Sequence, residues 1–411
     1  MRIRNKVAIA GAGAAGCLAA IELKRRSPET EVTVLEAGPR PLAKVALTGG
    51  GRCNLTNTFA EVQDLRDIYP RGYRLMKRAL REFGPEDTVR WFEGESVRLK
   101  EEAGGRIFPQ SDDALQVVRT LQNALTREGV VLRCNARIRA IRPEGPAYRL
   151  ETDGPEVLSD SVIVTTGGSP KISGLDFLSP LGLRIEAPVP SLFTLKTGVA
   201  GIKALMGTVA PDAVLSIPGT AFRAAAPLLL TDWGFGGPAT LKLSSLAARH
   251  LAECGYQTAL AVNWTGTGEQ AVRASLATLS TANAQKMMAN TPYPGLPSRL
   301  WAYLLERSGL RTDIRWAELG SKGLNRLVST LTNDPYQTTG RTTFKEEFVT
   351  CGGVSLDEIQ SSTLEAKAHP GLFFAGEVLD IDAVTGGFNL QAAWTTGWIC
   401  ARSAAEYLSK L

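Results

Sequence analysis

A run of glycines near the start of the chain, followed by one carboxylate, has the spacing of a dinucleotide site. Gly11, Gly13 and Gly16 come directly after the apolar residues 7–10, and Glu36 lies twenty residues beyond the last glycine. Glycines at this spacing allow a tight turn, close approach to a pyrophosphate and packing of a helix on a strand, while the acidic residue binds ribose hydroxyls. The alternative is a turn that only packs and binds nothing. The predicted nucleotide contacts also include three neighbours, Ala14, Ala15 and Ala37.

Residues 41–57, PLAKVALTGGGRCNLTN, form a second glycine-rich segment. Its triple glycine, residues 49–51, followed by Arg52, Cys53 and Asn54, predicts neither helix nor strand, but a backbone that can lie flat against a ring or a phosphate. Dehydrogenases that use a nicotinamide have no general need of such a loop, so the segment favours a flavin. The cofactor contacts predicted here are Lys44, Gly50, Gly51, Arg52, Cys53 and Asn54.

The side chains of this segment suggest different roles. Lys44 and Arg52 are obligate hydrogen-bond donors, and we expect them to bind phosphate or the carbonyl edge of the flavin. The thiol of Cys53 could take part in redox chemistry, but a small polarizable side chain packed under a ring would satisfy the same site. We favour packing, because no second cysteine lies near it in the sequence.

Two later segments are typical of buried strands that stop beside a ligand. They are SVIVTTGG, residues 161–168, and LFFAGE, residues 372–377. Residues 389–408 predict a helix whose first N–H groups have no partner of their own. That positive helix end would stabilise an electron-rich reduced flavin. The cofactor contacts predicted in these segments are Thr166, Gly167, Gly376, Glu377, Gly387, Asn389 and Leu390.

The motifs TGGGRCNLTN, CGGVSLDEI and GLFFAGEVLDIDAVTGGFNLQAAWTTG resemble those of the YhiN/BaiN-like flavoproteins, relatives of the fumarate reductase and glutathione reductase superfamily. The resemblance spans nearly the whole chain. It implies an α/β fold with a Rossmann-type domain that binds FAD noncovalently, and an inserted β-plus-helical domain over the isoalloxazine face. We place the FAD domain at residues 1–186 and 349–411 and the insert at 187–348. Residues 58–130 are expected to stay with the FAD domain as helices and loops, with Ser111 or Asp112 as a helix cap.

The resemblance also bears on catalysis. Arg106, in GGRIFP, resembles a family position near the mouth of the active site, and we predict that it orients an anionic or carbonyl substrate. An arginine that is merely on the surface is the alternative. Asn54 is the second candidate catalytic residue. In the insert, Asp232 stands where relatives tend to carry a histidine and Gly236 where they carry a serine, so a potential proton donor is missing.

The composition of the chain limits which other classes of protein and site are expected. The 411 residues, 44% of them hydrophobic, exceed one usual compact domain, and the six cysteines form neither CxxC pairs nor a zinc pattern. We expect no metal, no dithiol chemistry and no membrane segment or signal peptide, hence a cytoplasmic protein. The formal charge of +5 is spread along the chain, which gives nucleic-acid binding little support. Oligomeric state is left open.

These observations predict an FAD-dependent oxidoreductase that transfers a hydride between flavin N5 and a small organic substrate. No second strand–GxGxxG–helix unit is found, so NAD(P)H would dock transiently as the electron donor. Two alternatives stay open. One is an oxygen-using enzyme resembling amine oxidases of the aminoacetone oxidase type. The other is a flavin-binding sensor without catalysis.

Overall fold

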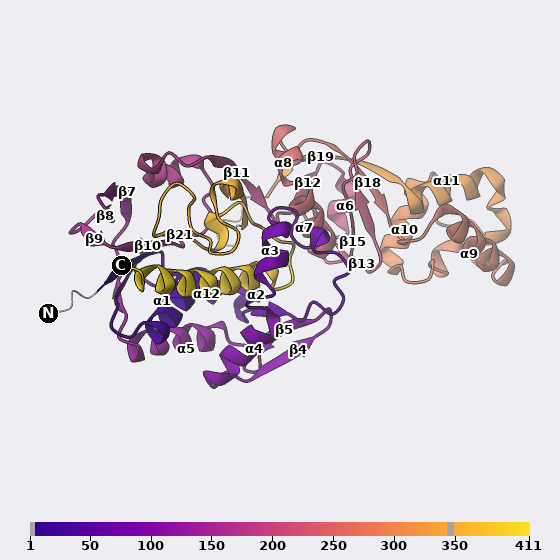
Figure 1. Ribbon diagram of the computed structural model, residues 1–411. Coiled ribbons are helices and arrows are strands. Elements are labelled where there is room, and N and C mark those ends of the chain that lie inside the picture. The colour runs from indigo at the N-terminus through magenta and orange to yellow at the C-terminus, as the bar shows by residue number, and fades with distance from the viewer. Residues whose placement is uncertain (1–4, 343–348) are drawn as a thin grey trace. The chain divides into compact units, whose positions relative to one another are not determined.

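The computed structural model describes residues 5–342 and 349–411, which divide into two compact units (Figure 1). The first comprises Met1–Pro190 with Phe344–Leu411, and the second Ser191–Thr343, both taken over their described residues. Each unit has its own hydrophobic core. The predicted domain limits at 186/187 and 348/349 stay a prediction, because the second limit falls at the edge of residues outside the described part of the chain.

A five-stranded parallel sheet forms the centre of the first unit. Its order is β21-β10-β1-β2-β6. The bounds are β1 (Lys6–Ala10), β2 (Glu31–Leu35), β6 (Val131–Arg133), β10 (Ser161–Val164) and β21 (Leu372–Phe374). The chain runs outward from β1 to β6 and then returns to the other side of β1. Ligands of such sheets bind beyond the carboxyl ends of the strands, where the order reverses, which here lies between β1 and β10.

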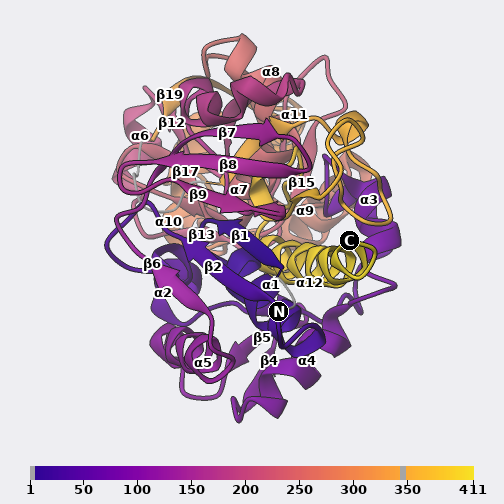
Figure 2. The same ribbon diagram turned by 60° about the vertical axis from the view of Figure 1, so that its left-hand side comes forward.

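Helices cover one face of this sheet and a small antiparallel sheet covers the other (Figure 2). The helices that pack together are α1 (Ala14–Arg26) and α12 (Phe388–Leu408), and the small sheet consists of β7 (Ile138–Glu144), β8 (Ala147–Thr152) and β9 (Val157–Ser159). A Cβ atom built on Gly397 of α12 would lie 2.5 Å from the carbonyl oxygen of Ala15 in α1. The two helices therefore touch backbone to backbone.

A three-stranded sheet corrects the prediction that residues 58–130 hold only helices and loops. Its order is β3-β5-β4, with β3 (Thr56–Asn57), β4 (Leu99–Glu102) and β5 (Arg106–Pro109). Gly104 and Gly105 join β4 to β5 with φ angles of 76° and 68°, positive values that glycine adopts without steric cost. The helices of this region are α3 (Tyr73–Ala79), α4 (Pro85–Gly94) and α5 (Ala114–Arg127).

The predicted helix caps in this region are also wrong. Asp113 caps α5, because its carboxylate accepts a hydrogen bond from the N–H of Leu115 at 2.8 Å. Asp112 instead pairs with Arg52 and Lys100, and Ser111 hydrogen-bonds Gln116. Ser111, Asp112 and Asp113 all lie near the start of the helix. Which of them caps it depends on the backbone direction at each residue, and the sequence does not show that direction.

The second unit is built on an eight-stranded antiparallel sheet of order β13-β16-β17-β12-β19-β18-β14-β15. The strands are β12 (Leu195–Thr197), β13 (Val209–Ala210), β14 (Val214–Ser216), β15 (Arg223–Ala225), β16 (Leu228–Leu230), β17 (Gly234–Gly236), β18 (Ala259–Asn263) and β19 (Asp334–Arg341). The helices are α6 (Ala200–Ala204), α7 (Gly237–Leu246), α8 (Ala248–Glu253), α9 (Glu269–Ala282), α10 (Ser298–Arg307) and α11 (Gly320–Thr332). The predicted α/β class, with a Rossmann-type sheet and an inserted β-plus-helical part, is confirmed.

Two segments link the units. The first includes β11 (Ile185–Ser191), which pairs with β20 (Val349–Val354) in a two-stranded sheet. Part of the second falls on residues 343–348, which lie outside the described residues.

The packing of α1 on α12 yields the first testable prediction. Gly397→Ala places a methyl group against the Ala15 carbonyl, and we expect the free energy of unfolding of the first unit to fall by about 1–3 kcal/mol, the usual cost of overpacking. Urea unfolding followed by circular dichroism measures the change. Gly94→Ala, at the exposed end of α4, is the control, because a Cβ there meets no described atom within 4 Å. Equal losses in both variants would contradict the close contact.

Candidate functional site

The turn from β1 into α1 is closed around Thr165, the residue after β10. Its hydroxyl donates to the carbonyl oxygens of Ala10 at 3.0 Å and Gly11 at 2.8 Å. A Cβ on Gly11 would lie 2.6 Å from the Thr165 carbonyl oxygen, and one on Gly16 would lie 2.0 Å from the Gly11 carbonyl oxygen. A Cβ on Gly13, by contrast, meets no described atom within 4 Å. Gly11 and Gly16 therefore serve packing, and Gly13 leaves open space before α1.

The N-terminus of α1 can hold an anion. In the described structure no side chain caps it, its first turn carries no acidic residue, and its last turn carries Lys24, Arg25 and Arg26. Free N–H groups and the positive end of the helix dipole both favour a phosphate here. Ala14 is half-buried, whereas the side chain of Ala15 is buried, so Ala15 can offer only its backbone.

Glu36 lies at the carboxyl end of β2, as predicted for a ribose-binding carboxylate. Its Oε2 accepts from the N–H of Ala12 at 2.9 Å and its Oε1 from the N–H of Gly38 at 2.7 Å. These bonds orient the half-buried carboxylate, and each oxygen keeps a lone pair for a hydroxyl donor. Ala37 beside it is exposed.

The segment predicted to be a loop contains a short helix. Residues Ala43–Gly51 form α2, but Thr48, Gly49 and Gly50 have non-helical angles, so a kink interrupts it. The break at the glycines agrees with the predicted loop, and the residues before them form a helix because AKVAL is a good helix former. Gly50 and Gly51 are exposed, with no described atom within 4 Å of a Cβ built on either. Their backbone is thus open to a ligand.

Cys53 follows this segment and is fully buried. Burial raises the pKa of its thiol to about 12, against a smaller opposing effect of a hydrogen bond with Thr48. The thiol therefore stays protonated at neutral pH and is a poor nucleophile. This agrees with a packing role. It does not support the redox alternative, because the reactive form of a cysteine is the thiolate.

Arg52 is engaged by carboxylates rather than aimed at open space. Its Nε donates to Asp112 at 2.8 Å, its Nη2 forms an ion pair with Glu102, and its guanidinium lies over the ring of Phe108 at 4.2 Å. These partners raise its pKa, first of all through the hydrogen bond with Glu102. These contacts fasten the glycine segment to the β4–β5 hairpin, and the contact of Arg52 with phosphate or the carbonyl edge of the flavin stays a prediction.

Lys44 and Glu377, two predicted cofactor residues, do come together. Lys44 Nζ lies 3.7 Å from Glu377 Oε2. Glu377 Oε1 accepts from the backbone N–H of Thr350 at 2.7 Å and from its hydroxyl at 3.1 Å. A Cβ on Gly168 would lie 2.5 Å from Glu377 Oε1, so the strand end at 165–168 also reaches this place. Thr166 is exposed there and Gly167 half-buried, with a φ of 76°.

The start of α12 is held by backbone and amide contacts. Gly387 has a φ of 93°, and a Cβ there would lie 2.4 Å from the Thr56 carbonyl oxygen. With its amide oriented to satisfy both partners, Asn54 donates to Thr56 O at 3.2 Å and accepts from Gly387 N at 3.1 Å. Asn54 therefore positions the helix start, and its predicted catalytic role stays untested. In the described structure no side chain caps α12.

Asn389 uses its side chain inside the protein. Its Oδ1 accepts from Ala383 N and its Nδ2 donates to Ala383 O, both at 2.9 Å. The backbone N–H of Asn389 lies in the first turn of α12, and its predicted contact with the flavin stays a prediction. Leu390 next to it is half-buried. Gly376, with a φ of 76°, lies against α1, where a Cβ would be 3.2 Å from the Ala15 Cβ.

Sequence reasoning missed the residues that close the site. Thr165 binds the glycine turn, Thr350 orients Glu377, and Thr396 accepts the N–H of Gly376 at 2.9 Å. The threonine before Thr166 in TTGG was a usable signal, because a hydroxyl after a buried strand needs a backbone partner. The other two have partners that are distant in sequence, and no local pattern marks them.

Together these residues suit a flavin dinucleotide. Gly397 contacts Ala15 in the first turn of α1, and α12 begins nine residues earlier, about 14 Å along its axis at about 1.5 Å per residue. The start of α1 thus lies beside Gly397, and the start of α12 lies at the other end of this stretch. Within the described part of the chain both helix starts lack a side-chain cap, which suits a diphosphate at the start of α1 and a redox ring at the start of α12. The residues placed to hold such a group are Gly13, Ala14, Glu36, Lys44, Gly50, Gly51, Gly167, Glu377 and Gly387.

Arg106, the candidate substrate residue, begins β5. Its Nε donates to the carbonyl oxygen of Ala103 at 2.9 Å, and its guanidinium lies 5.9 Å from the ring centroid of Phe108. It is half-buried, and within the described residues no other hydrogen bond of its guanidinium is seen. Unlike Arg52, it keeps donors available.

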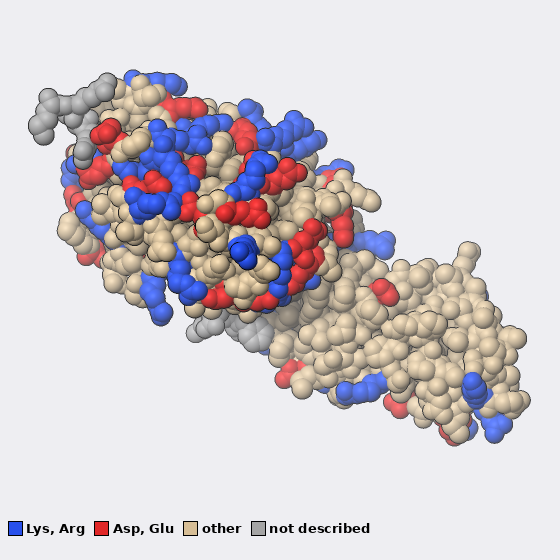
Figure 3. Space-filling model, turned by 90° about the horizontal axis from the view of Figure 1, so that it is seen from below, with Lys and Arg blue, Asp and Glu red and all other residues tan. Residues whose placement is uncertain are grey.

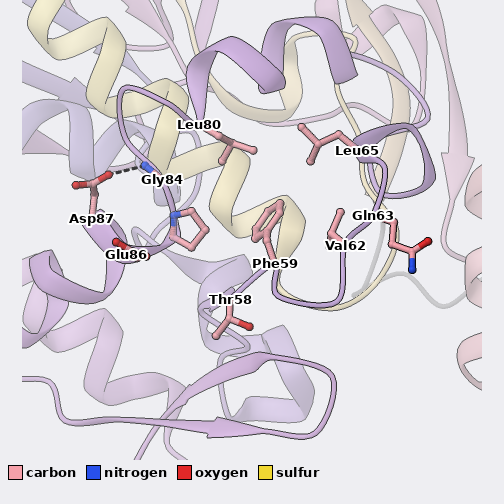
Figure 4. Close-up of a pocket in the computed structure, with 10 residues that line it drawn as sticks. Thr58, Phe59, Val62, Gln63, Leu65, Leu80, Gly84, Glu86 and Asp87 are labelled. Carbon is pink, nitrogen blue, oxygen red and sulfur yellow. Dashed lines mark hydrogen bonds between the residues drawn. The ribbon is translucent and has the colours of Figure 1, made fainter.

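A separate pocket of about 450 Å³ opens beside α4 (Figure 4). Apolar side chains form much of its wall, with Glu86 and Asp87 at one side, and none of the predicted cofactor residues lines it. We therefore do not place the cofactor in it. Its lining residues are Thr58, Phe59, Val62, Gln63, Leu65, Leu80, Gly84, Pro85, Glu86 and Asp87.

The described residues hold neither a metal-binding cluster nor a membrane-spanning helix. No cluster of three or more histidine, cysteine, aspartate or glutamate side chains that could hold a metal ion is present among them. No helix among them is long and apolar enough to cross a membrane.

The raised thiol pKa of Cys53 predicts how stability depends on pH. An unfolded cysteine loses its proton above about pH 8.5, whereas the folded thiol keeps it until about 12. Above pH 8.5 the unfolded state therefore binds fewer protons, and the free energy of unfolding falls by up to about 1.4 kcal/mol per pH unit from this group. We expect the free energy of unfolding, measured with urea, to fall less steeply with pH in Cys53→Ala than in the wild type between pH 9 and 11, by this amount. Between pH 6 and 8 the two proteins should show the same pH dependence. The same pH dependence between pH 9 and 11 would contradict the prediction.

Glu36 yields a prediction for binding. Glu36→Gln keeps the shape but removes the charge that strengthens hydrogen bonds from hydroxyl groups, and such bonds contribute about 1.5–3 kcal/mol. Its NH2 group also cannot accept one of the two backbone N–H bonds that orient the carboxylate. We expect FAD affinity to fall roughly ten- to hundredfold, measured by equilibrium titration of flavin fluorescence. Glu31→Gln, at the exposed start of the same strand, is the control. Unchanged affinity in Glu36→Gln would contradict the assignment of Glu36 to the ribose.

Comparison with known proteins agrees with this geometry. The family described as HI0933-like protein Rossmann domain matches residues 5–403. The 3-dehydro-bile acid delta(4,6)-reductase of Clostridium scindens is 28% identical over 415 residues, which cover 98% of this chain and 99% of that protein. The ribosomal RNA dihydrouridine synthase of Escherichia coli is 30% identical over 410 residues, covering 96% of each.

Among solved structures, E. coli quinol fumarate reductase FrdA is 14% identical, with a TM-score of 0.50, and the match covers 99% of this chain and 71% of that one. At this identity the likeness concerns the fold alone. The resemblance to the YhiN/BaiN-like flavoproteins is confirmed by the family match and the two curated relatives. The chain belongs to the family described as HI0933-like protein Rossmann domain.

Proposed function

We propose that the protein reduces a carbon–carbon double bond conjugated with a carbonyl group in a small organic substrate. FAD is the noncovalent cofactor and NAD(P)H the transient electron donor. The observation that carries the proposal is that two relatives, each matched over 96% or more of this chain, are named for reactions of this one kind.

The two named reactions share their chemistry. A 3-dehydro-bile acid delta(4,6)-reductase saturates double bonds conjugated with a 3-oxo group, and a dihydrouridine synthase saturates the uracil double bond next to a carbonyl. In each, a hydride adds to the carbon remote from the carbonyl and a proton to the nearer one. Bound FAD would supply the hydride. Overall, NAD(P)H and one proton are consumed, and NAD(P)⁺ and the saturated product are formed.

Arg106 has the properties that this reaction asks of a protein side chain. Negative charge develops on the substrate carbonyl oxygen as the hydride adds, and a fixed donor beside that oxygen lowers the barrier. The Nε of Arg106 is anchored on Ala103 O, so its remaining N–H groups are held in one direction. Arg52 is less suited, because two carboxylates already engage it.

A second candidate is the same reduction on a uridine of ribosomal RNA. The 30% identity to the E. coli synthase favours it. We prefer the small substrate, because lysine, arginine, aspartate and glutamate side chains intermix on the face of the first unit that Figure 3 shows, and this face offers no continuous positive track for a phosphate backbone.

The proposal is tested by separating the two halves of the reaction under anaerobic conditions. NADH or NADPH should bleach the flavin absorbance of the purified holoprotein, and a small 3-oxo-4-ene compound should restore it, yielding the saturated product by mass spectrometry. In Arg106→Ala we expect the second step to slow roughly ten- to thousandfold while the first is preserved, the usual effect of losing one donor to a developing oxyanion.

One control variant and three contrary results separate the proposal from its alternatives. Arg119→Ala, an exposed arginine paired with Asp113, should leave both steps unchanged. Reoxidation by an unmodified ribosomal RNA transcript, but not by the enone, would favour the second candidate. Peroxide formed from small amines would favour the amine-oxidase alternative. Bound flavin that no donor reduces would favour a sensor.

A further inference from the structure

We propose that Asn57 is a positioning residue that couples the turn before Arg106 to the start of α12. The inference deepens the function proposed above and rests on it. Asn57 lies in β3, and neither substrate nor flavin is assigned to its side chain. It joins the two segments that are proposed to contact them, the turn before Arg106 and the start of α12.

The Asn57 amide uses both its donors and its acceptor on backbone groups. The side chain is buried, with 3% of the residue exposed. Its Nδ2 donates to the carbonyl oxygens of Gly104 at 2.8 Å and Gly386 at 3.1 Å, and its Oδ1 accepts from the N–H of Phe59 at 2.8 Å. A carboxylate of the same shape would offer no donor, and a leucine of similar size would offer neither donor nor acceptor.

One of these bonds fixes the hairpin turn that carries Arg106. Asn57 is the register partner of Arg106 in the β3–β5 pair. Its bond to Gly104 O holds the turn from inside the fold, while a Cβ on Gly105 would lie 2.3 Å from Thr58 Oγ1. The turn therefore packs against residues 57–58 at two successive glycines. Its loosening would move Arg106 directly.

The other bonds fix the approach to α12. The Gly386 carbonyl held by Asn57 comes directly before Gly387, the residue that precedes the helix. The bond to Phe59 N holds that residue at a φ of 60°, a costly angle for a bulky side chain. The Phe59 ring in turn packs edge-to-face on Phe388, the first residue of α12, with centroids 5.0 Å apart. One amide therefore constrains the backbone on both sides of the helix start.

The consequence for function is coupled geometry. The free N–H groups at the start of α12 stabilise negative charge on a reduced flavin only while they point at it, and Arg106 stabilises the substrate oxygen only from a fixed distance. Asn57 holds both to one another through a single buried side chain. Its loss should change the flavin itself as well as the turnover.

The test compares Asn57→Leu and Asn57→Asp with the wild-type holoprotein. We expect a more negative flavin midpoint potential, an altered visible absorption spectrum and a kcat lowered roughly ten- to hundredfold with a smaller change in KM. In Asn57→Asp a protonated carboxyl can donate one of the lost bonds, so its potential and kcat should move toward wild type between pH 8.5 and pH 5.5. In flavin-free protein, hydrogen exchange of the amides at 386–391 should be faster.

Asn263→Leu is the matched control. Asn263 organises a turn of the second unit in the same manner, accepting from Thr265 N and Gly266 N and donating to Thr267 O. It should leave potential, spectrum and exchange at 386–391 unchanged. Should Asn57→Leu not fold, the isosteric Asn57→Asp and its pH response carry the test.

The outcomes separate the two proposals. Wild-type potential, spectrum and rates in both Asn57 variants overturn the coupling and leave the proposed function standing. A similar loss in Asn263→Leu also overturns it, since the effect would then be general destabilisation. A wild-type protein that takes up no flavin overturns the proposed function and the coupling together.

Discussion

The close approach of backbone to backbone at the carboxyl ends of β1 and β10 is the constraint on which the first unit depends. Thr165 bonds the carbonyls of Ala10 and Gly11, and Gly16 allows α1 to come down on the same turn. On its other side α1 meets α12 at Gly397. Segments more than 350 residues apart in the chain are thereby held within atomic contact, and two uncapped helix starts follow from that one arrangement.

This constraint explains which predictions from sequence succeeded. Glycines at Gly11, Gly13 and Gly16 predicted strand, turn and helix because their requirement is local: a missing side chain is visible in the sequence itself. The buried strands before Thr165 and Gly376 were likewise visible as short apolar runs. These few positions agree with the fold class that the family resemblance implies, since a parallel sheet with a crossover has few alternative topologies.

Side-chain roles were less predictable, because they depend on partners elsewhere in the chain. Arg52 pairs with Glu102 and Asp112, fifty and sixty residues away, and its sequence context said nothing of either. The hairpin that supplies Glu102 was missed because LKEE lacks the β-branched residues typical of strands, and its turn glycines rather than its strand residues determine it. A cationic residue in a glycine-rich segment is thus an ambiguous signal until its counter-charges are known.

The same reasoning accounts for the asparagines around the start of α12. Asn54, Asn57 and Asn389 each use an amide donor and an amide acceptor on backbone groups there. Any carboxylate in their places would face backbone carbonyls without a donor, and any ammonium would face N–H groups without an acceptor. A neutral amide satisfies both and adds no net charge. The three asparagines therefore do not oppose the positive end of the helix dipole. A redox ring that gains negative charge on reduction would therefore meet oriented N–H groups there rather than a competing carboxylate.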